Sequence, residues 1–274
     1  MDDPTLLLQL LMLLVAVGAF AGVLAGLLGV GGGIVLVPAY FFVFTTLGYN
    51  NDQIMQLCVA TSLATIIVTS ARSLSSHHKK GAVDWDILRG WAPGIMVGSI
   101  IGVLVVAQLR TTVLQILFGG LATLVGLYMA FGRSDWRLAA EMPVGWRRAA
   151  LSPMVGFLSV LMGVGGGSFG VPLMSLHNRP IHRAVATAAG FGMLIAVPSV
   201  IGFLLLEMDD DVRPPFSIGL VNLAAFAVTV CMTVLTAPLG ARLAHSLPPT
   251  RLRRVFAMFL LLVAANMIRK ALGW

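Results

Sequence analysis

Charged residues interrupt this sequence so rarely that the gaps between them describe its architecture. Reading Asp, Glu, Lys and Arg as interruptions leaves eight long uncharged runs, which are 4–51, 53–71, 90–109, 111–132, 149–178, 184–206, 214–241 and 255–268. A helix needs about 20 apolar residues to cross the ~30 Å hydrocarbon layer of a bilayer. Five of the runs therefore have the length of one membrane-spanning helix, and the last reaches that length when extended slightly past its flanking arginines.

Two runs need a different interpretation. The run 4–51 must hold two elements, whereas the run 149–178 is too long for one span and too short for two. The second of these predicts two short helices that either span the bilayer or are re-entrant, because irregular backbone is tolerated at membrane depth where protein surrounds it. The ten predicted elements are 6–28, 34–47, 53–71, 90–109, 111–132, 148–162, 168–177, 184–206, 214–241 and 250–272.

Composition agrees with an all-α polytopic membrane protein. Apolar residues make up 58% of the chain and charged residues only 11%, too few to cover the surface of a soluble protein of 274 residues. The net charge of +7 comes without a basic stripe containing interleaved aromatics, which excludes nucleic acid as a partner. Cys58 and Cys231 lie in hydrophobic elements without metal-ligand spacing, and we expect neither a metal nor a cofactor.

The basic residues give the chain an orientation. If the elements carry the chain alternately across the membrane from an outside N-terminus, fourteen of the 18 Lys and Arg residues fall inside. The four outside are Arg110, Arg213, Arg269 and Lys270. Because cytoplasmic loops are enriched in Lys and Arg, we expect a multi-pass protein of the cytoplasmic (inner) membrane with both termini outside. The count is the same whether the short elements span fully or are re-entrant.

The two halves of the chain share a motif. Gly29–Pro38 and Gly163–Pro172 agree at seven of ten positions, and Val59–Ser62 matches Val185–Ala188 farther along. Matches in the same order indicate duplication. Since each half has five elements, an odd number, the second half is predicted to lie upside down relative to the first. Inverted repeats of this kind are typical of secondary transporters, whose substrate sites lie near the midplane between the repeats.

The repeat predicts how the chain is divided. The first inverted repeat is expected over 1–132, a cytoplasmic linker over 133–147 and the second repeat over 148–274.

The glycine motifs suggest a binding site built from backbone. Consecutive glycines are poor helix formers, so each motif is expected to end one helix and let the next begin, at Gly33 or Gly167. A helix start presents free N–H groups and a positive dipole end, which suits an anion without any charged side chain. The candidate binding glycines are Gly31, Gly32, Gly33, Gly165, Gly166 and Gly167, and the candidate hinge or helix-break residues are Gly29, Pro38, Gly163 and Pro172. The alternative is that these glycines only allow helices to pack closely.

Hydroxyl groups follow each motif. Thr61, Ser62, Ser168 and Thr187 could donate to an anion near the midplane, or could instead bond to backbone or to a neighbouring helix. Arg72 and Arg183 lie near the cytoplasmic ends of two elements, where they either guide an anion inward or only extend into the interface.

The acidic residues determine the sign of the expected substrate. None of the eleven Asp and Glu residues lies within a predicted hydrophobic element. Cation carriers and proton pumps usually place a carboxylate at membrane depth, so this interior favours a small anion. No proton relay is visible in the membrane elements, which leaves the coupling ion open, with protons as one candidate.

The duplicated Gly-Val-Gly-Gly-Gly-x-x-x-Val-Pro motif, followed by Ala-Thr-Ser at 60–62 and Ala-Thr-Ala at 186–188, resembles the TauE/SafE family of sulfite exporter-like permeases. The resemblance covers residues 6–272 and carries the glycine-proline motif onto both halves. It implies an inner-membrane permease that moves sulfite or an organosulfonate, with export as the activity that names the family. The chain departs from the family at Ala188, where many members have a second serine equivalent to Ser62.

Three kinds of function were compared. The first is a secondary transporter that works by alternating access, as a monomer or homodimer in the lipid bilayer. The second is a passive anion channel of the same architecture, which could use the same helix starts. The third is an intramembrane enzyme, which the absence of any buried acidic or Cys–His constellation in the sequence disfavours. We therefore predict a transporter with no catalytic residues.

Overall fold

The fold consists of helices in the order that the hydrophobic runs predict. The computed structural model describes residues 4–28, 33–132, 136–208, 213–246 and 249–273. The first five helices are α1 (Pro4–Leu28), α2 (Gly33–Thr46), α3 (Ile54–Lys79), α4 (Trp85–Val106) and α5 (Thr111–Phe131). The remaining elements are α6 (Gly145–Leu161), α7 (Gly167–Leu176), α8 (Ile181–Leu204), the antiparallel strands β1 (Ser217–Ile218) and β2 (Val221–Asn222), α9 (Leu223–Ser246) and α10 (Pro249–Ala271). The predicted all-α fold with ten hydrophobic helical elements is confirmed.

Some helix boundaries differ from the predicted ones. α3 continues past Arg72 to Lys79, and α4 already begins at Trp85, because a helix can extend beyond the bilayer-sized segment with polar and charged residues. α9 begins at Leu223 although its uncharged run starts at 214. Pro214 and Pro215 lack the N–H groups that a helix interior requires, and the short β1–β2 hairpin occupies this stretch instead.

The surface of the bundle carries a belt of apolar side chains. Within the described residues, α3, α4, α5 and α8 are long and apolar enough to cross a membrane. On α4 the side chains of five large apolar residues are 40–63% exposed, namely Met96, Val97, Ile100, Ile101 and Leu104. Such a surface would drive association in water but faces hydrocarbon without cost in a lipid bilayer.

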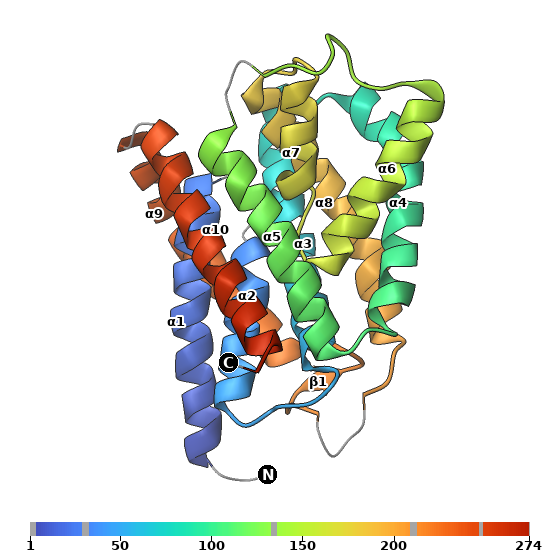
Figure 1. Ribbon diagram of the computed structural model, residues 1–274. Helices are drawn as coiled ribbons and strands as arrows, with labels where there is room; N and C mark the ends of the chain where they lie inside the picture. The colour runs from blue at the N-terminus through green and yellow to red at the C-terminus, as the bar shows by residue number, and fades with distance from the viewer. Residues whose placement is uncertain (1–3, 29–32, 133–135, 209–212, 247–248, 274) are drawn as a thin grey trace.

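The helices pack in corresponding pairs. α1 packs along α9 and α4 packs along α6, while α5 packs against α10 and α3 against α8. The short helices α2 and α7 pack on α3 and α8 respectively. When α1–α5 are matched in order with α6–α10, the α1–α9 pair corresponds to the α4–α6 pair, and the α2–α3 pair corresponds to the α7–α8 pair. The α3–α8 and α5–α10 pairs each correspond to themselves. Figure 1 shows α5 and α10 running side by side at the front of the bundle.

Glycines allow two of these pairs to approach closely. A Cβ added at Gly98 of α4 would overlap the carbonyl group of Pro153 on α6, and one added at Gly156 of α6 would overlap that of Ile95. In the corresponding pair, a Cβ at Gly22 of α1 would overlap the side chain of Thr236 on α9. Helices in a membrane associate largely through close packing of small residues, because lipid is as apolar as the side chains it surrounds.

The helices α3 and α8, which we call the central helices, each form a hydrogen bond to the residue directly before a helix of the other half. The N–H of Asp84, directly before α4, donates to Thr187 Oγ1 of α8 at 3.0 Å. The N–H of Asn222, directly before α9, donates to Thr61 Oγ1 of α3, also at 3.0 Å. We call these two bonds the cap–threonine contacts, because Asp84 and Asn222 also cap their helices by accepting from Ile87 and Ala225 N–H groups respectively.

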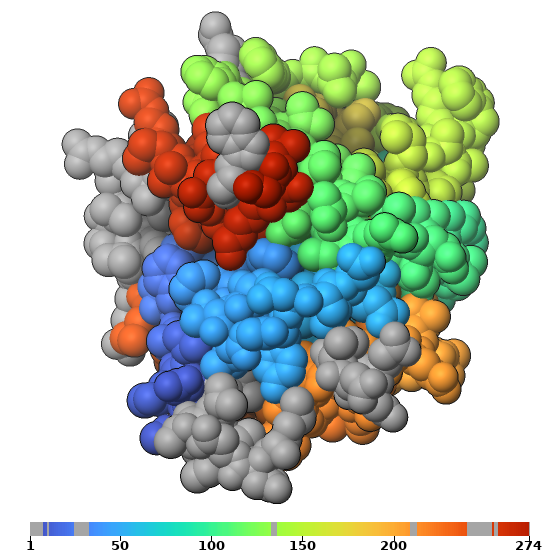
Figure 2. All heavy atoms as spheres, turned by 60° about the horizontal axis from the view of Figure 1, so that its bottom comes forward, coloured from blue at the N-terminus to red at the C-terminus, as the bar shows by residue number. Residues whose placement is uncertain are grey.

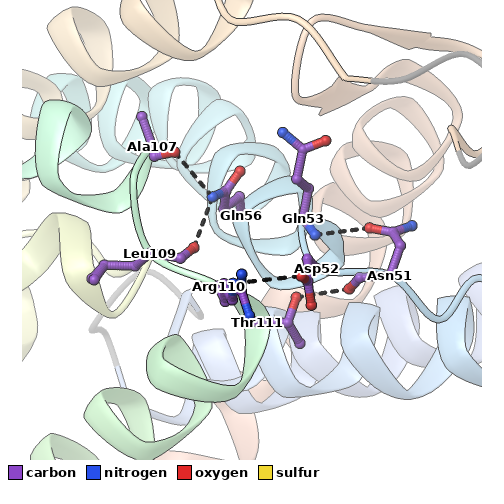
Figure 3. Close-up of polar contacts among 8 residues, drawn as sticks. All are labelled: Asn51, Asp52, Gln53, Gln56, Ala107, Leu109, Arg110 and Thr111. Atoms are coloured by element: carbon purple, nitrogen blue, oxygen red, sulfur yellow. Dashed lines mark hydrogen bonds and ion pairs between the residues drawn. The ribbon is translucent and has the colours of Figure 1, made fainter.

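The bundle has two distinguishable ends. The hairpin end contains β1–β2 and the α2–α3 and α4–α5 connections, and the α7–α8 end contains the α3–α4 and α7–α8 connections; they lie at the bottom and top of Figure 1. At the hairpin end, the Gln56 amide donates to the carbonyls of Ala107 and Leu109 at 3.3 and 2.8 Å, and Thr111 Oγ1 donates to the Asn51 carbonyl at 3.0 Å (Figure 3). The Gln56 bonds satisfy carbonyls in the segment that directly follows α4, and the Thr111 bond links the start of α5 to the segment before α3. Light-blue atoms of α2 and the segment leading into α3 cover the middle of this face (Figure 2).

The close α4–α6 packing generates a stability prediction. Gly98→Ala should destabilise the folded protein by about 1–3 kcal/mol, because the new methyl group forces two backbones apart. Thermal unfolding of the detergent-solubilised protein measures this loss. Gly120→Ala on α5 is the matched control, since a Cβ there meets nothing within 4 Å. Equal losses for the two variants would contradict the packing argument.

The cap–threonine contacts generate a second prediction. Thr61→Val should lower the free energy of unfolding by about 1–3 kcal/mol, because it leaves the buried N–H of Asn222 without its acceptor. Thr61→Ser keeps the hydroxyl and should recover most of the loss in the same thermal assay. Thr69→Val serves as control, since that hydroxyl donates within α3, to the carbonyls of Thr65 and Ile66. A valine at position 61 that is as stable as serine would disprove the contact's structural role.

Candidate functional site

Both short helices begin within the repeated glycine motifs. α2 starts at Gly33 and α7 at Gly167, the positions that the sequence predicts. Gly163 has a φ of +61°, a left-handed conformation that favours glycine and ends the run of α6. Gly29, Gly31 and Gly32, which belong to the first motif, lie outside the described residues. The site is therefore built from Gly33 and from the complete second motif.

The start of α2 lies against the segment that leads into α7, inside the bundle. α2 occupies the lower half and α7 the upper half in Figure 1. A Cβ added at Gly33 would lie 3.1 Å from both the Gly163 carbonyl oxygen and the Val164 Cα. Gly33, Gly163 and Val164 are all buried. The first described residue of α2 thus packs directly against the segment that leads into α7.

The central helices α3 and α8 line this meeting point. A Cβ at Gly33 would lie 2.7 Å from the Ile66 side chain of α3, and one at Gly165 would lie 3.3 Å from the same residue. On the other side, a Cβ at Gly166 would overlap Phe191 of α8 and lie 2.6 Å from the Ala188 carbonyl. Larger residues do not fit these positions unless their neighbours move. The glycines therefore let backbone atoms, rather than side chains, form the interior surface.

Ser62 connects the two motifs. Its hydroxyl donates to the Gly163 carbonyl at 2.7 Å, and the carbonyl of Gly33 is 3.5 Å from the same oxygen. Ser62 lies on α3 and is fully buried. Ala188, at the corresponding position of α8, has no hydroxyl to make such a bond. The Ser62/Ala188 difference between the halves therefore means that α3 forms a side-chain hydrogen bond to a glycine motif and α8 cannot form the corresponding one at this position.

The start of α7 supplies backbone donors. The first N–H groups of a helix, here those of Gly167, Ser168 and Phe169, have no carbonyl within the helix to bond. Gly166 precedes them as the N-cap and provides no side-chain cap. Ser168 is buried in this first turn. The helix dipole adds a partial positive charge at the same place, so the arrangement can hold an anion without a charged side chain.

The motif prolines lie inside the short helices. Pro38 is in α2 and Pro172 in α7. Because proline has no N–H, the carbonyls of Ile34 and Ser168 lack the helical donor four residues on. Each short helix therefore keeps a backbone carbonyl available one turn from its start.

The other predicted site residues take different places. The hydroxyl oxygens of Thr61 and Thr187 accept the cap–threonine hydrogen bonds, so these threonines hold the starts of α9 and α4. A hydroxyl that accepts one hydrogen bond still carries its own O–H donor. Arg72 and Arg183 are exposed and are not brought to the buried glycine motifs.

The partners of the threonines, Asp84 and Asn222, were not among the predicted site residues. A polar residue directly before an apolar helical run is the signal that could have found them. No group of three His, Cys, Asp or Glu side chains that could hold a metal ion gathers among the residues that the structure describes.

Comparison with known proteins identifies the family to which this chain is similar. The family model described as "Sulfite exporter TauE/SafE" matches residues 14–267. A probable membrane transporter protein of Haemophilus influenzae is 30% identical over 260 residues, which cover 95% of this chain and 98% of that protein. The probable membrane transporter protein YunE of Bacillus subtilis is 27% identical, with 93% and 96% of the two chains covered.

A further relative has a more specific name. The probable inner membrane transporter protein TsaS of Comamonas testosteroni is 28% identical over 210 residues, covering 77% of this chain and 82% of that protein. These relatives are named as transporters and not as enzymes. No solved structure matches the chain at a significant level. The family match over most of the chain, together with the apolar helical bundle, shows that this chain is a membrane protein of the transporter type and belongs to the TauE/SafE sulfite exporter family.

Proposed function

We propose that this protein is a secondary transporter that moves a small sulfur-containing anion, sulfite or an organosulfonate, across the cytoplasmic membrane. The observation that carries the proposal is the packing of Gly33, at the start of α2, against Gly163 and Val164 in the segment that leads into α7, with Ile66 of α3 beside both Gly33 and Gly165. Two helix starts directed at one region sum their positive potentials. A sulfite or sulfonate group presents three oxygen acceptors, which suits a lining of N–H and hydroxyl donors.

The proposed site would bind a cation less favourably than an anion. A cation at two helix starts would face the positive ends of both dipoles and would need a compensating carboxylate. The buried polar side chains near the motifs are neutral, as in the cases of Ser62 and Ser168. An anion bound there needs no buried arginine or lysine, so the empty site does not leave an unpaired charge in an apolar interior.

Alternating access is the mechanism that we propose, with the two inverted repeats at 1–132 and 148–274 moving about the glycine breaks. The corresponding helix pairs support it, because two related units that pack through equivalent contacts can exchange two equivalent arrangements. We infer export from the family name and an outside location of both termini from the charge distribution, and protons are one candidate for the coupling ion. The printed name of TsaS supports the inner membrane as the location.

The glycine site predicts a specific loss of transport. Wild-type protein in liposomes should move sulfite or a short sulfonate, and Gly165→Leu should reduce the initial rate at least tenfold, because it places a large side chain against Ile66 directly before the start of α7. Gly120→Leu, on the open face of α5, should transport normally. Thermal unfolding of both variants separates loss of the site from loss of the fold. A folded Gly165→Leu variant that transports at the wild-type rate would contradict the proposed site.

Counterflow distinguishes a carrier from a channel. Liposomes preloaded with unlabelled anion should take up labelled anion faster than empty ones, because a carrier returns more quickly when its site is occupied. A passive channel of the same architecture would show no such acceleration. Measuring labelled sulfite uptake with and without internal sulfite, at zero membrane potential and equal pH, decides between the two mechanisms.

A further inference from the structure

An ion pair lies at the α7–α8 end, away from the glycine site. Asp84, which caps α4, and Arg179, in the α7–α8 connection, approach to 3.7 Å between Oδ2 and a guanidinium nitrogen. Their side chains are 15% and 36% exposed, so the pair is only partly shielded from solvent. Because 3.7 Å is longer than a hydrogen bond, Asp84 does not fully satisfy the N–H donors of the Arg179 guanidinium.

Arg179 is held in place by its backbone. Asn178 adopts a φ of +60° directly before it, and the Arg179 N–H donates to the Met174 carbonyl at 3.0 Å. The Arg179 Nε is buried and has no hydrogen-bond acceptor among the described residues. An unsatisfied buried donor on a cation is costly. The residue is thus positioned to accept a bidentate oxygen ligand that Asp84 does not fully provide.

The repeat shows that capping α4 does not require a charged side chain. Asn222 occupies the corresponding position before α9, caps that helix at 2.8 Å and makes the same cap–threonine contact. Asparagine and aspartate are about equally good N-caps. The negative charge of Asp84 therefore has another role, and its one ion-pair partner given by the structure is Arg179.

We propose that Arg179 binds the transported anion on its way between the α7–α8 end and the glycine site, and that Asp84 is the counter-ion that this anion displaces. The inference rests on the proposed function, since it concerns the same substrate class. α7 is ten residues long, so Arg179 lies about 15–20 Å from the start of α7 at 1.5 Å per residue. The proposal therefore places Arg179 at one end of α7 and the N–H groups of the glycine site at the other.

The surroundings of the pair favour an anion. His77 and Lys80 at the end of α3 lie near His182 on the first turn of α8, and Arg89 stacks over Trp85 on α4. Asp86 is the acidic residue in the first turn of α4, and it is exposed. Lys80 and Arg89, which lie within five residues of Asp84 along the chain, add positive charge at this end beside Arg179, and a basic end raises the local concentration of an anion.

The test is a double-mutant cycle on the full-length protein in detergent. Binding of sulfite, and separately of methanesulfonate, is followed through the ligand-induced rise in melting temperature. Arg179→Gln should raise the half-saturating anion concentration at least tenfold, and Asp84→Asn should lower it about threefold to tenfold while keeping the α4 cap. In the double variant the effect of Asp84→Asn should vanish, because the carboxylate acts through Arg179.

The Asp52–Arg110 pair supplies matched controls. It has a similar separation of 3.6 Å, but it is exposed and lies at the hairpin end (Figure 3). Asp52→Asn and Arg110→Gln should leave anion binding unchanged. Unchanged binding by folded Arg179→Gln would overturn the inference. So would an Asp84→Asn effect that persists in the Arg179→Gln background, which would indicate a general electrostatic influence.

Failure of the inference is distinguishable from failure of the proposed function. If wild-type protein in liposomes transports sulfite or methanesulfonate and Arg179→Gln does so with unchanged concentration dependence, the transporter proposal stands and the role of Arg179 is wrong. If wild-type protein transports neither anion and neither raises its melting temperature, the proposed substrate class is wrong and the inference falls with it. Anion-dependent stabilisation that Arg179→Gln removes supports the inference by a measurement that does not require transport.

Discussion

The structure depends on satisfying backbone hydrogen bonds where helices are broken inside an apolar bundle. Lipid provides no donors or acceptors, so each open N–H or carbonyl at membrane depth must find a partner within the protein. Ser62 donates to the carbonyl of Gly163 at the break before α7, and toward the two ends of the bundle Thr61 and Thr187 accept the N–H groups that precede α9 and α4. These three hydroxyls sit on α3 and α8, which explains why the two central helices carry polar residues within otherwise apolar segments.

That constraint also explains why a binding site can form from glycine. Once side-chain hydroxyls hold the flanking segments, the first N–H groups of α7 have no carbonyl partner inside the helix, and Ser168 in this first turn is buried. A side chain at Gly33, Gly165 or Gly166 would fill the space in front of them or collide with α3 and α8. The same residues therefore serve packing and, in the proposed function, substrate binding, so the two alternatives that the sequence left open are compatible.

Much of this arrangement could be predicted from the sequence, because gaps between charges report bilayer-sized helices and glycine runs report breaks. The starts of α2 and α7 at Gly33 and Gly167 followed from the motif itself. The cap–threonine contacts could not be predicted, because they join residues 103 and 161 positions apart and depend on how the halves pack. The extension of α3 to Lys79 was also hidden, since polar residues outside the bilayer do not follow the hydrophobic pattern.

The two halves share sequence motifs and corresponding helix pairs, and the positions where they differ are therefore informative. Where both halves need the same bond, as at Thr61 and Thr187, the residues are identical and the need is structural. Where one half has Asn222 and the other has Asp84, either residue satisfies the shared capping function, and the added charge of Asp84 is available for its ion pair with Arg179. Ser62 and Ala188 differ in the same sense, since one links the two glycine motifs and the other cannot. Symmetry-related positions that differ in charge or hydrogen bonding are therefore where a direction of transport can be built into two otherwise equivalent halves.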